Sequence, residues 1–104
     1  MKIYIIGIGL IGGSFAIEMR KLFQKSTIIG IDKSENNLNK AHELGIIDKK
    51  SCLSEISNAD IILVSVPVKS IINLLPNILD KVNKNTLVID FGSKYRFNPR
   101  ILYT

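Results

Sequence analysis

The stretch IYIIGIGLIGGSFAIEM, residues 3–19, joins an apolar run to a cluster of glycines and then to apolar residues at helical spacing. The run over residues 2–8 is short and bounded by glycine, which predicts a strand buried on both faces. Over residues 11–24 the apolar side chains recur at the spacing of one helical face: Ile11, Phe15, Met19 and Leu22. Because glycine is tolerated where a side chain would be in the way, the cluster indicates that something approaches the backbone between strand and helix.

Three of these glycines, Gly7, Gly9 and Gly12, fit the pattern G-x-G-x-x-G where the predicted strand passes into the predicted helix. In that setting the first glycine makes the tight turn, the second lets the backbone approach a pyrophosphate, and the third lets the helix pack on the strand. The phosphates would lie at the helix N-terminus, where N–H groups and the helix dipole favour negative charge. The alternative interpretation is a tight turn without a ligand.

A carboxylate follows the glycines at the distance that a dinucleotide site needs. Asp32 ends a second apolar run, residues 27–32, about twenty residues after Gly12, and could bind the ribose hydroxyls of an adenosine. Its charge would repel a 2′-phosphate, which favours NAD as the cofactor, although the neighbouring Lys33 keeps NADP as an alternative. A capping or surface role is the other interpretation of Asp32.

The rest of the chain continues this alternation of strand and helix. Pro67 closes the strand before it, and Pro76 is expected to bend or split the last helix. The expected elements are strands over residues 27–32, 50–52, 60–66 and 86–91, and helices over residues 35–44, 53–56 and 69–81. Such alternation implies right-handed crossovers and a doubly wound parallel α/β sheet, a Rossmann-type dinucleotide-binding domain.

Composition narrows the class of protein. With 104 residues, 46% hydrophobic and 22% charged, the chain is expected to form one small globular domain. The net charge of +5 is scattered rather than gathered with aromatic residues, so we expect no nucleic-acid partner. No segment reaches the roughly 18 to 20 apolar residues of a membrane span, so no membrane partner is expected. Cys52 is the single cysteine and lacks metal-ligand spacing, which favours the cytoplasm and no metal.

Four stretches together resemble the cofactor-binding half of prephenate dehydrogenase: GIGLIGGS (7–14), IIGIDKSENNLNKAHELGIID (28–48), ADIILVSVPV (59–68) and LVIDFGS (87–93). The resemblance covers residues 1–93, which we expect to form the dinucleotide-binding domain. It implies an oxidoreductase of tyrosine biosynthesis that passes hydride to NAD(P)+ and turns prephenate into 4-hydroxyphenylpyruvate and carbon dioxide. Arogenate dehydrogenases share these motifs, so the substrate is either prephenate or arogenate.

By motif matching, the resemblance implies one set of cofactor-binding residues: Gly7, Gly9, Leu10, Ile11, Gly12, Asp32, Ser65, Val66 and Pro67. Ser93 falls where the family has a serine near the substrate and the catalytic histidine. For Pro67 and Ser93 alone, a strand terminator and a turn residue are equally good interpretations. These groups follow the C-terminal ends of predicted parallel strands, where open α/β sheets bind ligands.

The end of the chain departs from the family pattern. The family continues into a helix, a histidine-bearing H-P motif and a helical domain that dimerises, whereas residues 94–104 read KYRFNPRILYT. We therefore expect an atypical tail and a truncated chain that lacks the catalytic and dimerisation domain and is inactive alone. His42, the only histidine, falls on the helix over residues 35–44 and is expected to be solvated, so no catalytic residue is assigned.

The missing lobe would leave one sheet edge and the last helix uncovered, which predicts apolar surface and self-association. Two alternatives to the leading interpretation stay open. One is the cofactor domain of another NAD(P)-dependent enzyme, such as a β-hydroxyacid dehydrogenase. The other is a stand-alone nucleotide-sensing module.

Overall fold

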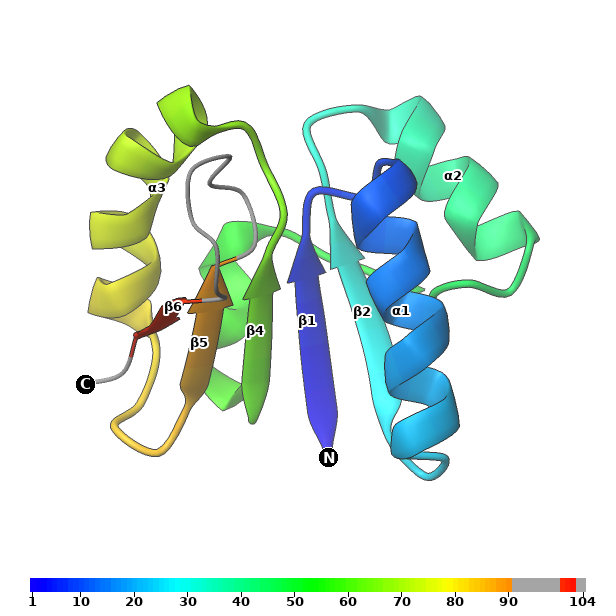
Figure 1. Ribbon diagram of the computed structural model, residues 1–104, viewed down its shortest axis with the longest axis horizontal. Coiled ribbons are helices and arrows are strands. Elements are labelled where there is room, and N and C mark those ends of the chain that lie inside the picture. The colour runs from blue at the N-terminus through cyan, green and yellow to red at the C-terminus, as the bar shows by residue number, and fades with distance from the viewer. Residues whose placement is uncertain (91–99, 103–104) are drawn as a thin grey trace.

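Six strands form one sheet in the computed structural model, which describes residues 1–90 and 100–102 (Figure 1). The strands are β1 (Lys2–Ile6), β2 (Thr27–Ile31), β3 (Lys49–Lys50), β4 (Ile61–Val64), β5 (Leu87–Asp90) and β6 (Arg100–Leu102). Their order is β3-β2-β1-β4-β5-β6; the first five are parallel, and β6 runs antiparallel to β5. The doubly wound fold predicted from the sequence is confirmed. The strand order reverses between β1 and β4, where such sheets bind ligands.

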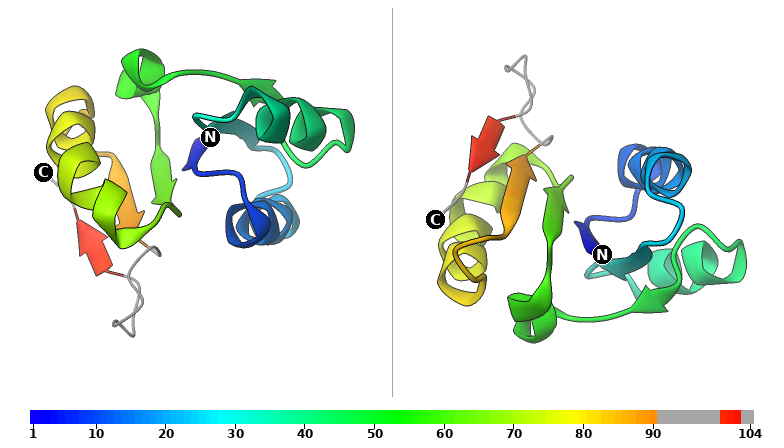
Figure 2. Two further views of the ribbon diagram at one scale, coloured as in Figure 1. Left: turned by 90° about the horizontal axis from the view of Figure 1, so that it is seen from above. Right: turned by 90° about the horizontal axis from the view of Figure 1, so that it is seen from below.

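The helices divide between the two faces of this sheet (Figure 2). They are α1 (Leu10–Leu22), α2 (Glu35–Glu43), a 3₁₀ helix η1 (Leu53–Asn58) and α3 (Val68–Lys81). Residues of α1 and α2 belong to one apolar cluster, and residues of η1 and α3 belong to the other. The Ser34 side chain caps α2 by accepting a hydrogen bond from the Asn37 N–H at 3.1 Å, as the sequence predicts.

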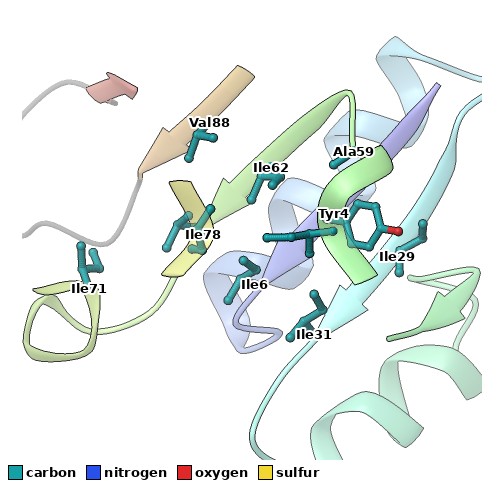
Figure 3. Packing of buried hydrophobic residues seen from close by; sticks show 11 residues of the cluster. Tyr4, Ile6, Ile29, Ile31, Ala59, Ile62, Ile71, Ile78 and Val88 are labelled. Carbon is teal, nitrogen blue, oxygen red and sulfur yellow. The ribbon is translucent and has the colours of Figure 1, made fainter. Parts of the chain in front are cut away.

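The strand β1 is buried on both faces, as its unbroken apolar sequence predicts. Ile3 and Ile5 face α1 and α2, whereas Tyr4 and Ile6 join the cluster under η1 and α3 (Figure 3). The Tyr4 hydroxyl donates a hydrogen bond to the Glu55 carbonyl oxygen at 3.0 Å, which ties η1 to the sheet. Burial raises the pKa of Tyr4, and the Glu55 carboxylate raises it further.

The face of α1 that packs on the sheet matches the predicted one only in part. Phe15 and Met19 are half-buried and pack against the core, as predicted, whereas Ile11 and Leu22 are exposed. The fully buried residues are the small ones, Gly12, Gly13 and Ala16, which a prediction based on large apolar residues missed. A Cβ on Gly12 would collide with the Gly7 carbonyl oxygen, so the helix approaches the turn too closely for a larger residue.

Three further expectations need correction. The helix α3 is continuous through Pro76 and is not split. Proline removes the N–H that would bond to the carbonyl of Ile72, and both residues are exposed, so water can reach that carbonyl. The strand β1 ends at Ile6 rather than residue 8, because Gly7 has a φ of 97° and leaves the extended conformation. The antiparallel strand β6 lies within residues 94–104, where no strand was predicted.

The close approach at α1 makes a prediction about two adjacent glycines. We expect Gly12→Ala to lower the free energy of unfolding by roughly 1–3 kcal/mol, because its methyl group would collide with the Gly7 carbonyl oxygen. Gly13→Ala should instead be neutral or stabilising by about 0.5–1 kcal/mol, because a Cβ there meets no atom within 4 Å and alanine favours the helix. Chemical denaturation of both variants measures the difference, and equal effects would contradict this account of α1.

Candidate functional site

A cleft of about 690 Å³ opens where β1, β2 and β4 end. These strand ends form the upper edge of the sheet in Figure 1. Its walls are the turn between β1 and α1, the segments that follow β2 and β4, and the first part of α3. Six residues singled out from the sequence line it: Gly7, Gly9, Asp32, Ser65, Val66 and Pro67. The fold therefore brings together residues that lie up to sixty positions apart in the chain.

Gly7 and Gly9 serve different purposes in the turn. Gly7 combines a φ of 97° with close approach to β4, because a Cβ would collide with the Ser65 carbonyl oxygen. Its N–H donates to the Ile31 carbonyl oxygen at 2.7 Å. A Cβ on Gly9, by contrast, would meet no protein atom within 4 Å. Since Gly9 lines the cleft, the space that its side chain would take is open to a ligand.

The N-terminus of α1 meets the cleft at Gly9, which is the N-cap residue of the helix. No side chain caps this end, and the first turn contains no acidic residue. The N–H groups of a first helical turn lack acceptors within the helix and carry the positive end of its dipole. The side chains of Leu10 and Ile11 are exposed and do not line the cleft, whereas Gly12 is buried behind the turn. Their backbone is what this site can offer a ligand.

Asp32 follows β2 and is half-buried at the cleft. One carboxylate oxygen accepts a hydrogen bond from the Ile8 N–H at 2.7 Å, and the other accepts one from the Ser34 N–H at 2.8 Å. Asp32 thus connects the glycine turn to the start of α2, which is the structural role that the sequence left open. A carboxylate offers about four acceptor positions, so it keeps capacity for ligand hydroxyls.

The wall formed by α3 was missed in the sequence. Lys69, Asn73 and Asn77 recur every four residues and line the cleft from one side of the helix. Leu53 of η1 and Leu74 of α3 add apolar surface beside Val66. The four-residue spacing was a visible signal, but only the strand order places this side of α3 opposite Asp32.

Several other residues lie away from the cleft or beyond the described chain. His42 is exposed on α2 and does not line the cleft. Ser93 lies outside the described residues. Among residues 1–90 and 100–102, no three His, Cys, Asp or Glu side chains gather into a potential metal site. Within the same residues, no helix has the length and apolar character to cross a membrane.

Comparison with known proteins identifies the family. Residues 15–96 match the family model of the nucleotide-binding domain of prephenate dehydrogenase. The chain belongs to this family. The match confirms the resemblance seen in the sequence and favours it over the β-hydroxyacid dehydrogenase alternative. The matched range begins after all three motif glycines, Gly7, Gly9 and Gly12, so the interpretation of the turn depends on its geometry and not on the family match.

Individual relatives agree with the family match. The chain is 40% identical over 94 residues to prephenate dehydrogenase from Lactococcus lactis, covering 88% of this chain and 26% of that protein. The prephenate dehydrogenase of Aquifex aeolicus, solved with hydroxyphenyl propionate and NAD+, has a TM-score of 0.82 at 29% identity, covering 89% of this chain and 34% of that one. Synechocystis arogenate dehydrogenase has a TM-score of 0.78 at 30% identity, covering 86% and 32%. The chain spans about a quarter of the length of the curated relatives it matches.

Proposed function

We propose that this chain binds NAD+ in the cleft, as the nucleotide-binding domain of a prephenate or arogenate dehydrogenase. The observation that carries the proposal is the open space beside Gly9, at an N-terminus of α1 that has no side-chain cap and no acidic residue. A pyrophosphate suits that place because N–H groups and the helix dipole both favour an anion. The family match and the NAD+ complex of the Aquifex enzyme support this choice of ligand.

In this proposal, different cleft residues bind different parts of the dinucleotide. The backbone from Gly9 to Gly12 would bind the pyrophosphate, and Asp32 would accept hydrogen bonds from the adenosine ribose. Leu53, Val66 and Leu74 provide apolar surface for the adenine ring. We also assign Ser65 and Pro67 to the cofactor side of the cleft, and Ser93 to the substrate side. When bound, the nicotinamide supplies a hydride acceptor.

The reaction proposed for the whole protein is oxidative decarboxylation. Prephenate would lose a hydride to NAD+ and a carboxyl group as carbon dioxide, which leaves 4-hydroxyphenylpyruvate and NADH; arogenate is the alternative substrate. In this proposal the described residues bind the cofactor. No histidine is among the described residues that line the cleft. We propose a cytosolic location, since Cys52 is a free and exposed thiol.

Calorimetric titration of the 104-residue chain with NAD+ tests the proposal directly. We expect saturable binding that is competed by AMP, because adenosine and its phosphate occupy the part of the cleft built from described residues. Binding should be weak, since the cleft is open to solvent. A titration without heat, repeated with NADH and with the same result, would overturn the proposed function.

The Asp32 assignment predicts a change in selectivity. We expect Asp32→Ala to lower NAD+ affinity by roughly tenfold, because a hydrogen bond to a charged group contributes about 1.5–3 kcal/mol, and to lower NADP+ affinity less. The substitution also removes acceptors from the Ile8 and Ser34 N–H groups, so Asp32→Asn, which keeps one carbonyl oxygen, is the matched variant. Titrations with both dinucleotides, alongside thermal unfolding, measure the ratio. An unchanged ratio would count against a ribose contact.

We further propose that the chain self-associates through exposed apolar side chains. Three of these side chains lie on α1: Leu10, Ile11 and Ile17 are 91%, 60% and 44% exposed. A fourth, Ile72, is 72% exposed and lies on α3, the last helix, where the sequence predicted apolar surface. Removing such surface from water is favourable by about 25 cal/mol per Å². We expect sedimentation to show association that rises with concentration and falls in Ile17→Lys. A monomer at all concentrations would favour the stand-alone sensing module.

A further inference from the structure

The strand β6 lies outside the part of the chain that matches the family. The family model ends at residue 96, whereas β6 comprises Arg100–Leu102. It pairs with β5 at one end of the sheet, and among the described strands it alone runs antiparallel to its neighbour (Figure 2). The family match therefore assigns no role to this strand.

The side of β5 that faces β6 presents main-chain hydrogen-bonding groups at every second residue. The Leu87 N–H donates to the Asp60 carbonyl oxygen at 3.0 Å, on the β4 side of the strand. Because main-chain groups alternate along a strand, Val88 and Asp90 direct their N–H and C=O groups to the other side, toward β6. An uncovered β5 would present these groups as a template for another strand.

The register of β6 fits these groups. Val88 lies opposite Leu102, and the next outward residue, Asp90, lies opposite Arg100. In such pairs the two facing residues exchange main-chain hydrogen bonds, whereas Ile101 between them directs its own N–H away from β5. The register also places an arginine opposite an aspartate, and opposite charges at facing positions stabilise a pair of strands.

A second copy of this chain is the partner that an uncovered β5 edge would fit. Two β5 strands related by a two-fold axis at Ile89 run antiparallel and place Val88 of one copy opposite Asp90 of the other, so the outward groups meet each other. Three of the four residues of β5 are apolar, which favours pairing between exposed edges. The strand β6 offers an arginine opposite Asp90, where a second copy would offer a valine.

We propose that the β5 edge is a strand-docking surface which residues 100–102 of this chain occupy, and that β6 thereby excludes a second copy from it. The chain associates through this edge only when β6 is displaced. No residue of β5 or β6 lines the cofactor cleft, so this inference is independent of the proposed function.

Hydrogen exchange of the intact chain, followed amide by amide, tests whether β6 holds the edge. Within β5, the amides of Leu87 and Ile89 point toward β4 and serve as the internal reference for the outward amides of Val88 and Asp90. We expect all four to be protected in the wild type. Outward amides that exchange as fast as an unstructured peptide, beside protected reference amides, would overturn the proposal.

Two proline substitutions in β6 test the hydrogen bonds to β5. Leu102→Pro removes a donor that points to β5, whereas Ile101→Pro is the matched control, because it removes a donor that points away and edge strands tolerate proline there. We expect Leu102→Pro to speed exchange of the outward amides by roughly tenfold at low protein concentration, and Ile101→Pro by less than about threefold. The reference amides should keep their protection in both variants, which shows that the rest of the sheet is intact.

Sedimentation of the same two variants tests the second copy as partner. Both carry Ile17→Lys, so that association through α1 does not contribute. We expect Leu102→Pro to form dimers at a concentration at which Ile101→Pro is monomeric, and its outward amides to regain protection as the dimer forms. Equal exchange and equal sedimentation in the two variants would overturn the role of β6. Fast exchange in a Leu102→Pro chain that stays monomeric at every concentration would overturn the docking surface.

Discussion

Gly9→Val is expected to abolish NAD+ binding while leaving the thermal unfolding of the chain nearly unchanged. Gly9 has φ and ψ of −96° and −155°, an extended conformation with a negative φ that does not require glycine. A Cβ at this position meets no protein atom within 4 Å, so the fold offers no clash. The branched side chain would instead project into the cleft at the N-terminus of α1, where the pyrophosphate must come close to backbone N–H groups.

The expected loss is large because several contacts fail together. A phosphate held away from the helix loses its charge-assisted hydrogen bonds, each of which contributes about 1.5–3 kcal/mol, so losing two corresponds to a decrease of at least roughly a hundredfold. Calorimetry measures the affinity, and thermal unfolding reports whether the fold is kept.

Two companion substitutions make the result interpretable. Gly13→Ala places a methyl group on the same helix at a residue that does not line the cleft, so it should retain full affinity. Gly9→Ala should weaken NAD+ by an intermediate amount, because its methyl group is smaller than the valine side chain. Equal NAD+ affinity in wild type and Gly9→Val would mean that the turn is only a structural connection between β1 and α1.

The part of the site that could be predicted from the sequence is the part encoded locally. Consecutive residues specify the first strand, the glycine turn and the helix that follows. The fold class then follows from the continued alternation of strand and helix along the chain. Asp32 could be placed because it ends a recognisable apolar run. Gly7 and Gly12 also have the predicted purposes, a tight turn and close packing, and the atoms that a Cβ would meet give the physical reason.

The remainder depends on contacts between distant segments. The predicted face of α1 was right for Phe15 and Met19 and wrong for Ile11 and Leu22. Helical periodicity favours large apolar residues, whereas the close approach of α1 to the turn selects Gly12 and Ala16. The second role of Asp32 depends on the Ile8 N–H, which lies 24 positions away. Lys69 was not singled out in the sequence, because only the folded sheet brings the first turn of α3, which follows β4, to the same cleft as the end of β2.

We expect the 104-residue chain to produce no NADH from prephenate, even where it binds NAD+. Hydride transfer requires the substrate carbon to be held against the nicotinamide, and such positioning can account for about 7–11 kcal/mol of a barrier. The chain spans about a quarter of the length of its curated relatives, so most of their length has no counterpart in the polypeptide that would be assayed. In the proposed assignment, the described cleft residues hold the cofactor, and none of them is assigned to the substrate.

The chemistry also needs a group that takes the proton of the substrate hydroxyl. General-base catalysis contributes typically about 10² to 10⁴ in rate, and histidine is its commonest agent. His42 is exposed on α2 and does not line the cleft, so it cannot reach a substrate bound there. Among the described cleft residues, Asp32 is the only carboxylate, and both of its oxygens already accept hydrogen bonds from backbone N–H groups.

The assay follows NADH absorbance with prephenate and, separately, with arogenate. A full-length prephenate dehydrogenase from Bacillus subtilis serves as the positive control, since this chain is 33% identical to it over 94 residues. The prediction is a rate indistinguishable from that of the chain without substrate. Turnover that survives His42→Ala would contradict it and would place a base and a substrate pocket elsewhere in the 104 residues. Because Gly9→Val removes the cofactor contact, loss of that turnover in the same variant would show that the reaction uses this cleft.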